Sequence, residues 1–176
     1  MPSPLGHALA GLTVHALLSR RREELLDVRR VAIAAGAAVA PDLDLLFKLV
    51  DGRNHHQAES HSLGCALLAA AVVWLLARGR DWPDAARLAV MAGAVWTSHV
   101  ALDYFGRDTH PPIGLMALWP VSSGYFKFPW PLFFDIGRTL TWETVRHDAV
   151  AVAWEAVLLL PPLMLCWRVR LREAAR

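Results

Sequence analysis

Apolar residues along the chain gather into five long stretches separated by polar connections. The stretches cover residues 5–18, 31–49, 62–77, 88–105 and 149–167, each to within a few residues, and each is long enough to form a helix. They are apolar around most of their circumference, which indicates burial in lipid or in a large core. The pattern predicts an all-α fold, a bundle of about five helices in a single domain over residues 1–176.

The lengths of the stretches do not separate a membrane protein from a compact soluble helical bundle. A spanning helix needs roughly 20 apolar residues, whereas 62–77 is shorter and 149–167 contains Glu155 and the pair Pro161-Pro162. The composition favours the membrane, because 55% of the residues are hydrophobic and only 19% are charged. We therefore expect a multi-pass membrane-embedded bundle, with the soluble bundle as the alternative.

Basic residues are concentrated in every second connection. Twelve of the 18 lysines and arginines follow the first, third and fifth stretches: Arg20, Arg21, Arg22, Arg29 and Arg30, then Arg78, Arg80 and Arg87, then Arg168, Arg170, Arg172 and Arg176. If the stretches alternate in direction, these residues lie on one side, which the positive-inside rule makes cytoplasmic. The amino terminus and the long connection 106–148, rich in aromatic residues and proline, then lie outside. We expect this connection to form an outer loop at headgroup level, or simply to cover the bundle.

Histidine and aspartate residues recur at the predicted outer end of these stretches. They are His7, Asp42, Asp44, His56, His61, His99 and Asp103. Because ionisable groups beside apolar stretches are costly to desolvate, their repeated appearance in one layer indicates that they bind a metal ion. Plainer alternatives are a buried hydrogen-bonded pair for His99 and Asp103, and helix capping for the others.

The local spacing suits a metal site. His99 and Asp103 are four residues apart, so both side chains lie on one helix face. We expect His56 in a loop and His61 at a helix start with Ser60 or Ser62 as its cap, while Pro41 interrupts the second stretch.

The donor types limit the metal and its chemistry. Histidines with two or three carboxylates and no cysteine suit Zn²⁺, with Mn²⁺ or Fe²⁺ as alternatives. More ligands are present than one tetrahedral zinc requires, so a dinuclear site with a bridging aspartate is expected, an arrangement suited to hydrolysis of phosphoesters. Asp44 or Glu59 is the candidate general base or outer carboxylate.

Other ionisable residues are expected outside the cluster. His15 lies too far along its helix from the first histidine, by about 12 Å, and His55 and His147 are expected to be spectators. His110 is either a loop residue or a substrate contact. Glu155 either faces the interior as an outer partner of the site or is hydrated near the interface.

The ordered motifs resemble a known family. They are Gly6-His7, Pro41-Asp42-Leu43-Asp44, His56 with His61-Ser62, His99-xxx-Asp103 and Leu118-Trp119-Pro120-Val121-Ser122. Together, over about residues 3–125, they resemble the YdjM-like family of inner-membrane-associated, metal-dependent hydrolases. Gln57 and Ser60 stand where a common family form has Arg and Thr, which leaves the ligands in place. The order of His and Asp is more distantly similar to that of the zinc-dependent phospholipase C and P1 nuclease group, and that fold-level analogy favours phosphoester chemistry.

The resemblance implies a helical inner-membrane hydrolase of bacteria. The apolar stretches and the distribution of arginines predict a multi-pass protein with the metal site toward the extracytoplasmic side. We expect membrane lipids and an unspecified phosphoester as partners, and the sequence shows no nucleic-acid-binding surface. One alternative is a non-enzymatic membrane protein that binds metal or moves metal ions or protons, for which His15 and Glu155 are the only hints of a path. Another is a soluble helical zinc phosphodiesterase.

Overall fold

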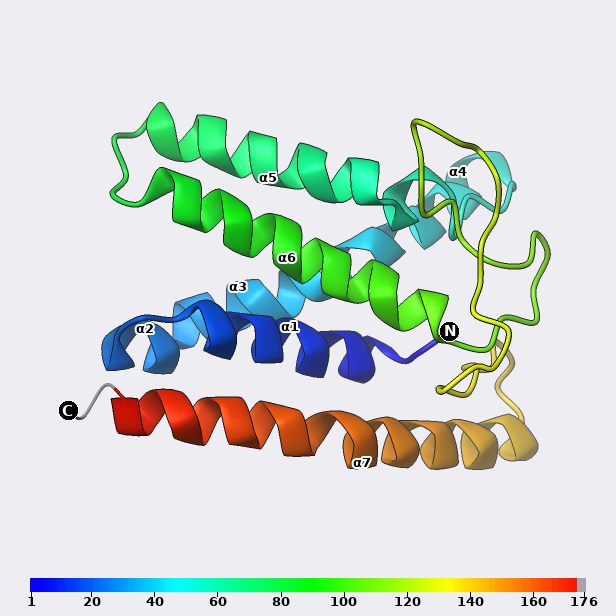
Figure 1. The fold of residues 1–176 in the computed structure, drawn as a ribbon. Helices are drawn as coiled ribbons and strands as arrows, with labels where there is room; N and C mark the ends of the chain where they lie inside the picture. Colours follow the sequence, from blue (N-terminus) through cyan, green and yellow to red (C-terminus); the bar gives the residue numbers. More distant parts are fainter. Residues whose placement is uncertain (174–176) are drawn as a thin grey trace.

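The computed structural model describes residues 1–173, and all regular elements in that range are helical. They are α1 (Pro4–Leu18), α2 (Arg22–Leu26), α3 (Val28–Val39), the 3-10 helix η1 (Ala40–Phe47), α4 (Lys48–Asp51), the 3-10 helix η2 (Glu59–His61), α5 (Leu63–Arg78), α6 (Ala85–Tyr104) and α7 (Trp142–Glu173). The long helices lie roughly side by side (Figure 1), and the all-α prediction is confirmed.

Three of the five predicted stretches, 5–18, 62–77 and 88–105, correspond within a few residues to α1, α5 and α6. The stretch 31–49 is not one helix. Pro41 has no N–H to donate and its ring disfavours the α conformation before it, so α3 ends at Val39 and the chain continues as η1 and α4.

The prediction of 149–167 was too short. Helix α7 begins at Trp142 and runs to Glu173, through Pro161 and Pro162, whose rings lie on its exposed side. The outer connection is correspondingly shorter than predicted and spans residues 105–141. Its later part is held against the end of α6 by hydrogen bonds from Phe128 N to the Tyr104 carbonyl and from Leu132 N to the carbonyl of Phe105, the residue after the helix.

Small residues allow close approach of the helices. A Cβ atom on Gly11 of α1 would lie 2.5 Å from Ala38 Cβ of α3, so only glycine permits this contact. Gly93 of α6 packs against Ala66 and Ala70 of α5 in the same manner. Packing of this kind holds helices together in lipid, where apolar burial supplies little driving force.

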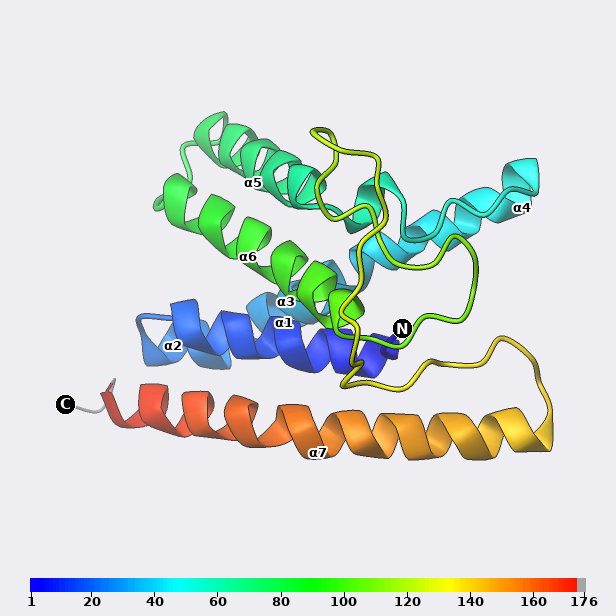
Figure 2. The same ribbon diagram turned by 45° about the vertical axis from the view of Figure 1, so that its right-hand side comes forward.

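The two ends of the bundle differ. The turns around α2 and between α5 and α6, and the end of α7, lie together at one end, while the connection 105–141 covers the other (Figures 1 and 2). At the α2 end Arg87 forms an ion pair with Glu24 and holds the pKa of that carboxyl at about 2. Helices α6 and α7 are each long and apolar enough to cross a membrane, and α1 and α5 are shorter apolar helices.

Candidate metal centre

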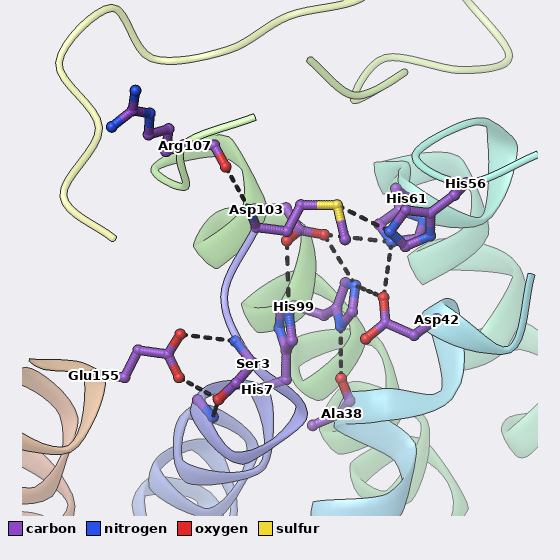
Figure 3. Close-up of polar contacts among 12 residues, drawn as sticks. Ser3, His7, Ala38, Asp42, His56, His61, His99, Asp103, Arg107 and Glu155 are labelled. Atoms are coloured by element: carbon purple, nitrogen blue, oxygen red, sulfur yellow. Dashed lines mark hydrogen bonds and ion pairs between the residues drawn. The ribbon is translucent and has the colours of Figure 1, made fainter. Parts of the chain in front are cut away.

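All six predicted metal ligands come together at the end of the bundle beneath the connection 105–141 (Figure 3). His7 comes from α1, Asp42 from η1, His56 from the loop after α4, His61 from η2, and His99 and Asp103 from α6. They form two sets in which potential ligand atoms lie within 4.8 Å of one another. The first set is His7, Asp42, His99 and Asp103, and the second is Asp42, His56 and His61. Asp42 belongs to both sets.

The first set is held by a break in α3. In a 3-10 turn the carbonyl of residue 38 would accept from the N–H of residue 41, but Pro41 has none. The Ala38 carbonyl instead accepts a hydrogen bond from His99 Nδ1 at 2.7 Å, which fixes the ring and turns Nε2 toward the cluster. His99 Nε2 lies 3.1 Å from Asp103 Oδ2, and the ring of His7 stacks on that of His99 with centroids 3.7 Å apart.

Asp44 contacts both histidines of the second set through their Nδ1 atoms. Its two oxygens lie 2.7 Å from His56 Nδ1 and 3.1 Å from His61 Nδ1. Ser60 Oγ donates to the same carboxylate at 2.6 Å. Both imidazoles therefore present Nε2 toward Asp42, as histidine ligands do when a carboxylate holds the other nitrogen.

Several polar atoms at the centre of the cluster are buried without a hydrogen bond. They are both ring nitrogens of His7, His99 Nε2, and both carboxylate oxygens of Asp103. The distances from Asp103 to the imidazole nitrogens are 3.1–3.5 Å, but the geometry does not direct an N–H at an oxygen. Leaving such groups unsatisfied is costly, and an ion between them would satisfy one ring nitrogen of His7, His99 Nε2 and the Asp103 carboxylate. The donor set thus fits a metal ion.

The charges support the same conclusion. Asp42, Asp44 and Asp103 form ion pairs only with histidines among the described residues, so no Lys or Arg neutralises them. Burying a carboxylate costs on the order of several kcal/mol unless it is paired. Although burial of His61 favours the neutral ring, its hydrogen bonds to Asp42 and Asp44 raise its pKa to about 10. Burial also opposes ionisation of Asp44, yet hydrogen bonds from His56, His61 and Ser60 hold its pKa well below the usual value. The cluster attracts positive charge.

The other predicted residues lie outside the two ligand sets. Glu59 is exposed, and its role as general base stays a prediction. His55 is paired with Asp51 at 2.6 Å, and His147 contacts the Asp135 carbonyl at 2.9 Å. His15 is buried toward the α2 end, with its ring 6.3 Å from that of Trp167.

Glu155 faces the interior but contacts α1 rather than a ligand. Its carboxylate accepts hydrogen bonds from Ser3 N at 2.7 Å and from Ser3 Oγ. Ser3 in turn caps α1 by accepting from Gly6 N at 3.1 Å. A Cβ on Gly6 would lie 2.6 Å from the Glu155 carboxylate, so a larger residue here would displace that side chain from its present position. Glu155 therefore anchors the helix turn that carries His7.

Some contributors to the site were not predicted. The Ala38 carbonyl and Asp44's contact with both rings depend on the fold, although Pro41 was a signal for the first. Trp96 Nε1 donates to the Ser60 carbonyl at 2.8 Å and holds the turn that carries His61.

The predicted helix cap after His61 is Ser62, one of the two alternatives. Ser62 caps α5 by accepting from Cys65 N at 3.0 Å. Met1 Sδ lies 2.9 Å from His56 Nε2 above the cluster.

A pocket of about 260 Å³ opens onto the cluster. Asp42 and His56 form its floor, Leu45 and Ile136 contribute apolar walls, and His110 and Arg138 bring positively charged or ionisable groups. A substrate contact was one of the two roles predicted for His110, and its place in the pocket lining is compatible with that role.

Comparison with curated proteins and with solved structures found no match. The profile of one family, described as YdjM inner membrane protein, matches residues 1–175. That match spans the whole cluster and confirms the resemblance carried by the histidine and aspartate motifs. The chain belongs to the YdjM inner membrane protein family.

Proposed function

We propose that the protein is a membrane-bound, metal-dependent hydrolase that cleaves a phosphoester. The observation that carries the proposal is the pair of ligand sets that share Asp42, together with an open pocket that Asp42 and His56 line. A purely structural metal site is usually closed, whereas a catalytic site keeps an open position. Zinc is the proposed ion, with Mn²⁺ or Fe²⁺ as alternatives, because the donors are imidazole and carboxylate without thiolate.

The six candidate ligands would bind two metal ions. His7, His99 and Asp103 would hold one ion, His56 and His61 would hold a second, and Asp42 would bridge them. When bound, two such ions activate water and stabilise the attacking and leaving oxygens of a phosphoester. Asp44 orients the two rings of the second set. The pocket walls position the substrate above Asp42.

The membrane placement proposed here is multi-pass, with the metal end outside. The family is an inner membrane family, which favours this over a soluble phosphodiesterase. A transport path would need ionisable groups that continue from the cluster across the bundle. Glu155 is instead engaged by Ser3, and His15 is separated from the cluster along α1, so these contacts favour a site over a conduit.

The proposal is tested by metal content and by activity on the same samples. Purified protein in detergent should hold about two transition-metal ions per chain and hydrolyse bis(p-nitrophenyl) phosphate. His99→Ala should lose bound metal and at least about 100-fold in activity, because a direct ligand matters more than an outer one. The matched control is His147→Ala, whose ring lies outside both ligand sets.

Two results would overturn the proposal. One is wild-type protein that holds no stoichiometric metal after loading. The other is a His99→Ala variant with wild-type metal content and activity.

A further inference from the structure

The pocket above the cluster continues into an exposed apolar arm. We define the arm as residues 43–50, the part of η1 and α4 that projects beyond the bundle (Figure 2). Leu45 lines the pocket, and the arm then presents Leu46, Phe47, Leu49 and Val50, whose exposed fractions are 56%, 61%, 83% and 84%. Four large apolar side chains exposed on either side of Lys48 are rare in a segment that meets water and typical of one that meets lipid.

The depth of the site in the bundle is consistent with a membrane-surface ligand. Glu155, which binds Ser3 beside the cluster, is nine residues along α7 from Arg146, or roughly 13 Å. If Arg146 lies among the outer headgroups, the cluster lies near the boundary between headgroups and acyl chains. The arm extends from this end of the bundle, away from the packed helices (Figure 2).

The pocket also offers a cation for an anionic group. Arg138 lines it and forms no ion pair with any residue in the described range 1–173. The two other carboxylates in the lining are already engaged. Asp108 accepts from His110 N and Gly114 N at 3.0 and 2.7 Å, and Asp135 accepts from Thr109 Oγ1 at 2.8 Å. A guanidinium binds phosphate oxygens through paired hydrogen bonds.

We propose that this pocket binds a membrane phospholipid. The phosphate lies between Arg138 and the two ligand sets that share Asp42, and the acyl chains lie along the arm. This inference rests on the proposed function, because it places the phosphate beside the metal ions. A free phosphate or a soluble phosphoester would use the metal end and Arg138 but would gain nothing from the apolar walls and arm. The arm therefore distinguishes a lipid from a soluble anion.

Binding, rather than turnover, tests the proposal. The metal-loaded protein is held in dodecyl maltoside, a detergent without phosphate, and titrated with dihexanoyl phosphatidic acid, with glycerol phosphate and with dihexanoylglycerol. The wild type should bind the phosphatidic acid at least about tenfold more tightly than either partial ligand, since only this probe fills both the phosphate site and the apolar surface. Equal affinity for glycerol phosphate would overturn the proposal in favour of a soluble phosphate ligand, and the absence of binding by metal-loaded protein would overturn it outright.

Variants separate the two halves of the ligand. Arg138→Gln should weaken binding of both phosphate-containing probes by about tenfold, whereas Arg146→Gln, outside the pocket, should not. Phe47→Ser should weaken binding of the two acylated probes and leave glycerol phosphate unchanged. Val121→Ser is its control, because Val121 is 92% exposed on the covering loop. Wild-type affinities in both Arg138→Gln and Phe47→Ser would contradict the proposal. Metal content is measured on the same samples. Metal-loaded protein that binds the phosphatidic acid but does not hydrolyse a phosphoester would support this inference while contradicting the proposed hydrolase.

Discussion

At the scale of single residues, Asp42 and Asp44 lie two positions apart yet have different surroundings. A 3-10 helix has three residues per turn, so side chains two residues apart point in directions that differ by about 120°. Asp42 consequently faces both ligand sets, while Asp44 lies behind His56 and His61. The change from α to 3-10 geometry at Pro41 thus leaves Asp42 as a candidate ligand and Asp44 as a hydrogen-bond partner of the histidines.

We expect Asp44→Asn to weaken metal binding by about 10–100-fold without removing it, because an amide still fills the space but cannot hold both rings as a carboxylate does. Asp42→Asn should cost more, since it weakens both ligand sets at once. Competition with a chelator of known affinity measures both effects on purified protein.

The control for Asp44→Asn is Asp51→Asn, in an exposed pair with His55 outside the cluster. Wild-type affinity in Asp44→Asn would show that the outer carboxylate is dispensable. A loss as complete as that of Asp42→Asn would make Asp44 a direct ligand instead.

At the scale of elements, the buried Glu155 joins α7 to the metal centre through α1. It caps the helix start through Ser3, only four residues before His7. A carboxylate at a helix N-terminus is also stabilised by the helix dipole. This contact gives α7, which packs mainly on α1, an influence on a site that it does not touch.

We expect Glu155→Ala to lower both thermal stability and metal affinity, because the α1 cap loses its buried partner. Loss of an N-cap interaction costs about 1 kcal/mol, and Glu155→Gln should fall between the alanine variant and the wild type. Thermal unfolding in detergent and chelator competition, each with and without metal, measure the two effects.

Ser3→Ala tests the same contact from α1. If the two residues act as one unit, the double variant should lose less than the sum of the single losses. Glu143→Ala, at an exposed position of the same helix, is the control. Additive losses, or unchanged metal affinity in Glu155→Ala, would contradict the anchoring role.

The same contacts explain how much could be predicted from the sequence. Helices α1, α5 and α6 follow apolar stretches whose length and hydropathy alone indicate a helix, so their positions were predictable. The candidate ligands His7, His61, His99 and Asp103 were predictable because they lie near one end of such stretches, and Asp42 and His56 lie in the segment between two of them. The partner of Glu155 was not, because Ser3 lies 152 residues away. Likewise, α7 extends beyond its apolar stretch through Trp142 and Glu143, where hydropathy carries no helix signal.

At the scale of the whole molecule, charge distinguishes the two ends of the bundle. Described arginines after α1, α5 and within the end of α7 gather at the end opposite the metal cluster. Translocating such charges is disfavoured, so this end should remain cytoplasmic. The cluster and the arm would then meet the outer leaflet of the inner membrane.

Cysteine labelling in intact cells tests this orientation. In a background with Cys65→Ser and Cys166→Ser, Val121→Cys on the covering loop should react with a membrane-impermeant maleimide before permeabilisation. Arg80→Cys, in the turn between α5 and α6, should react only afterwards, because the arginine-rich turn is held inside. The opposite pattern would place the metal centre at the cytoplasmic leaflet, so that any lipid reaching Arg138 would have to come from that leaflet instead. Equal labelling of both positions before permeabilisation in cells shown to be intact would contradict a fixed spanning orientation.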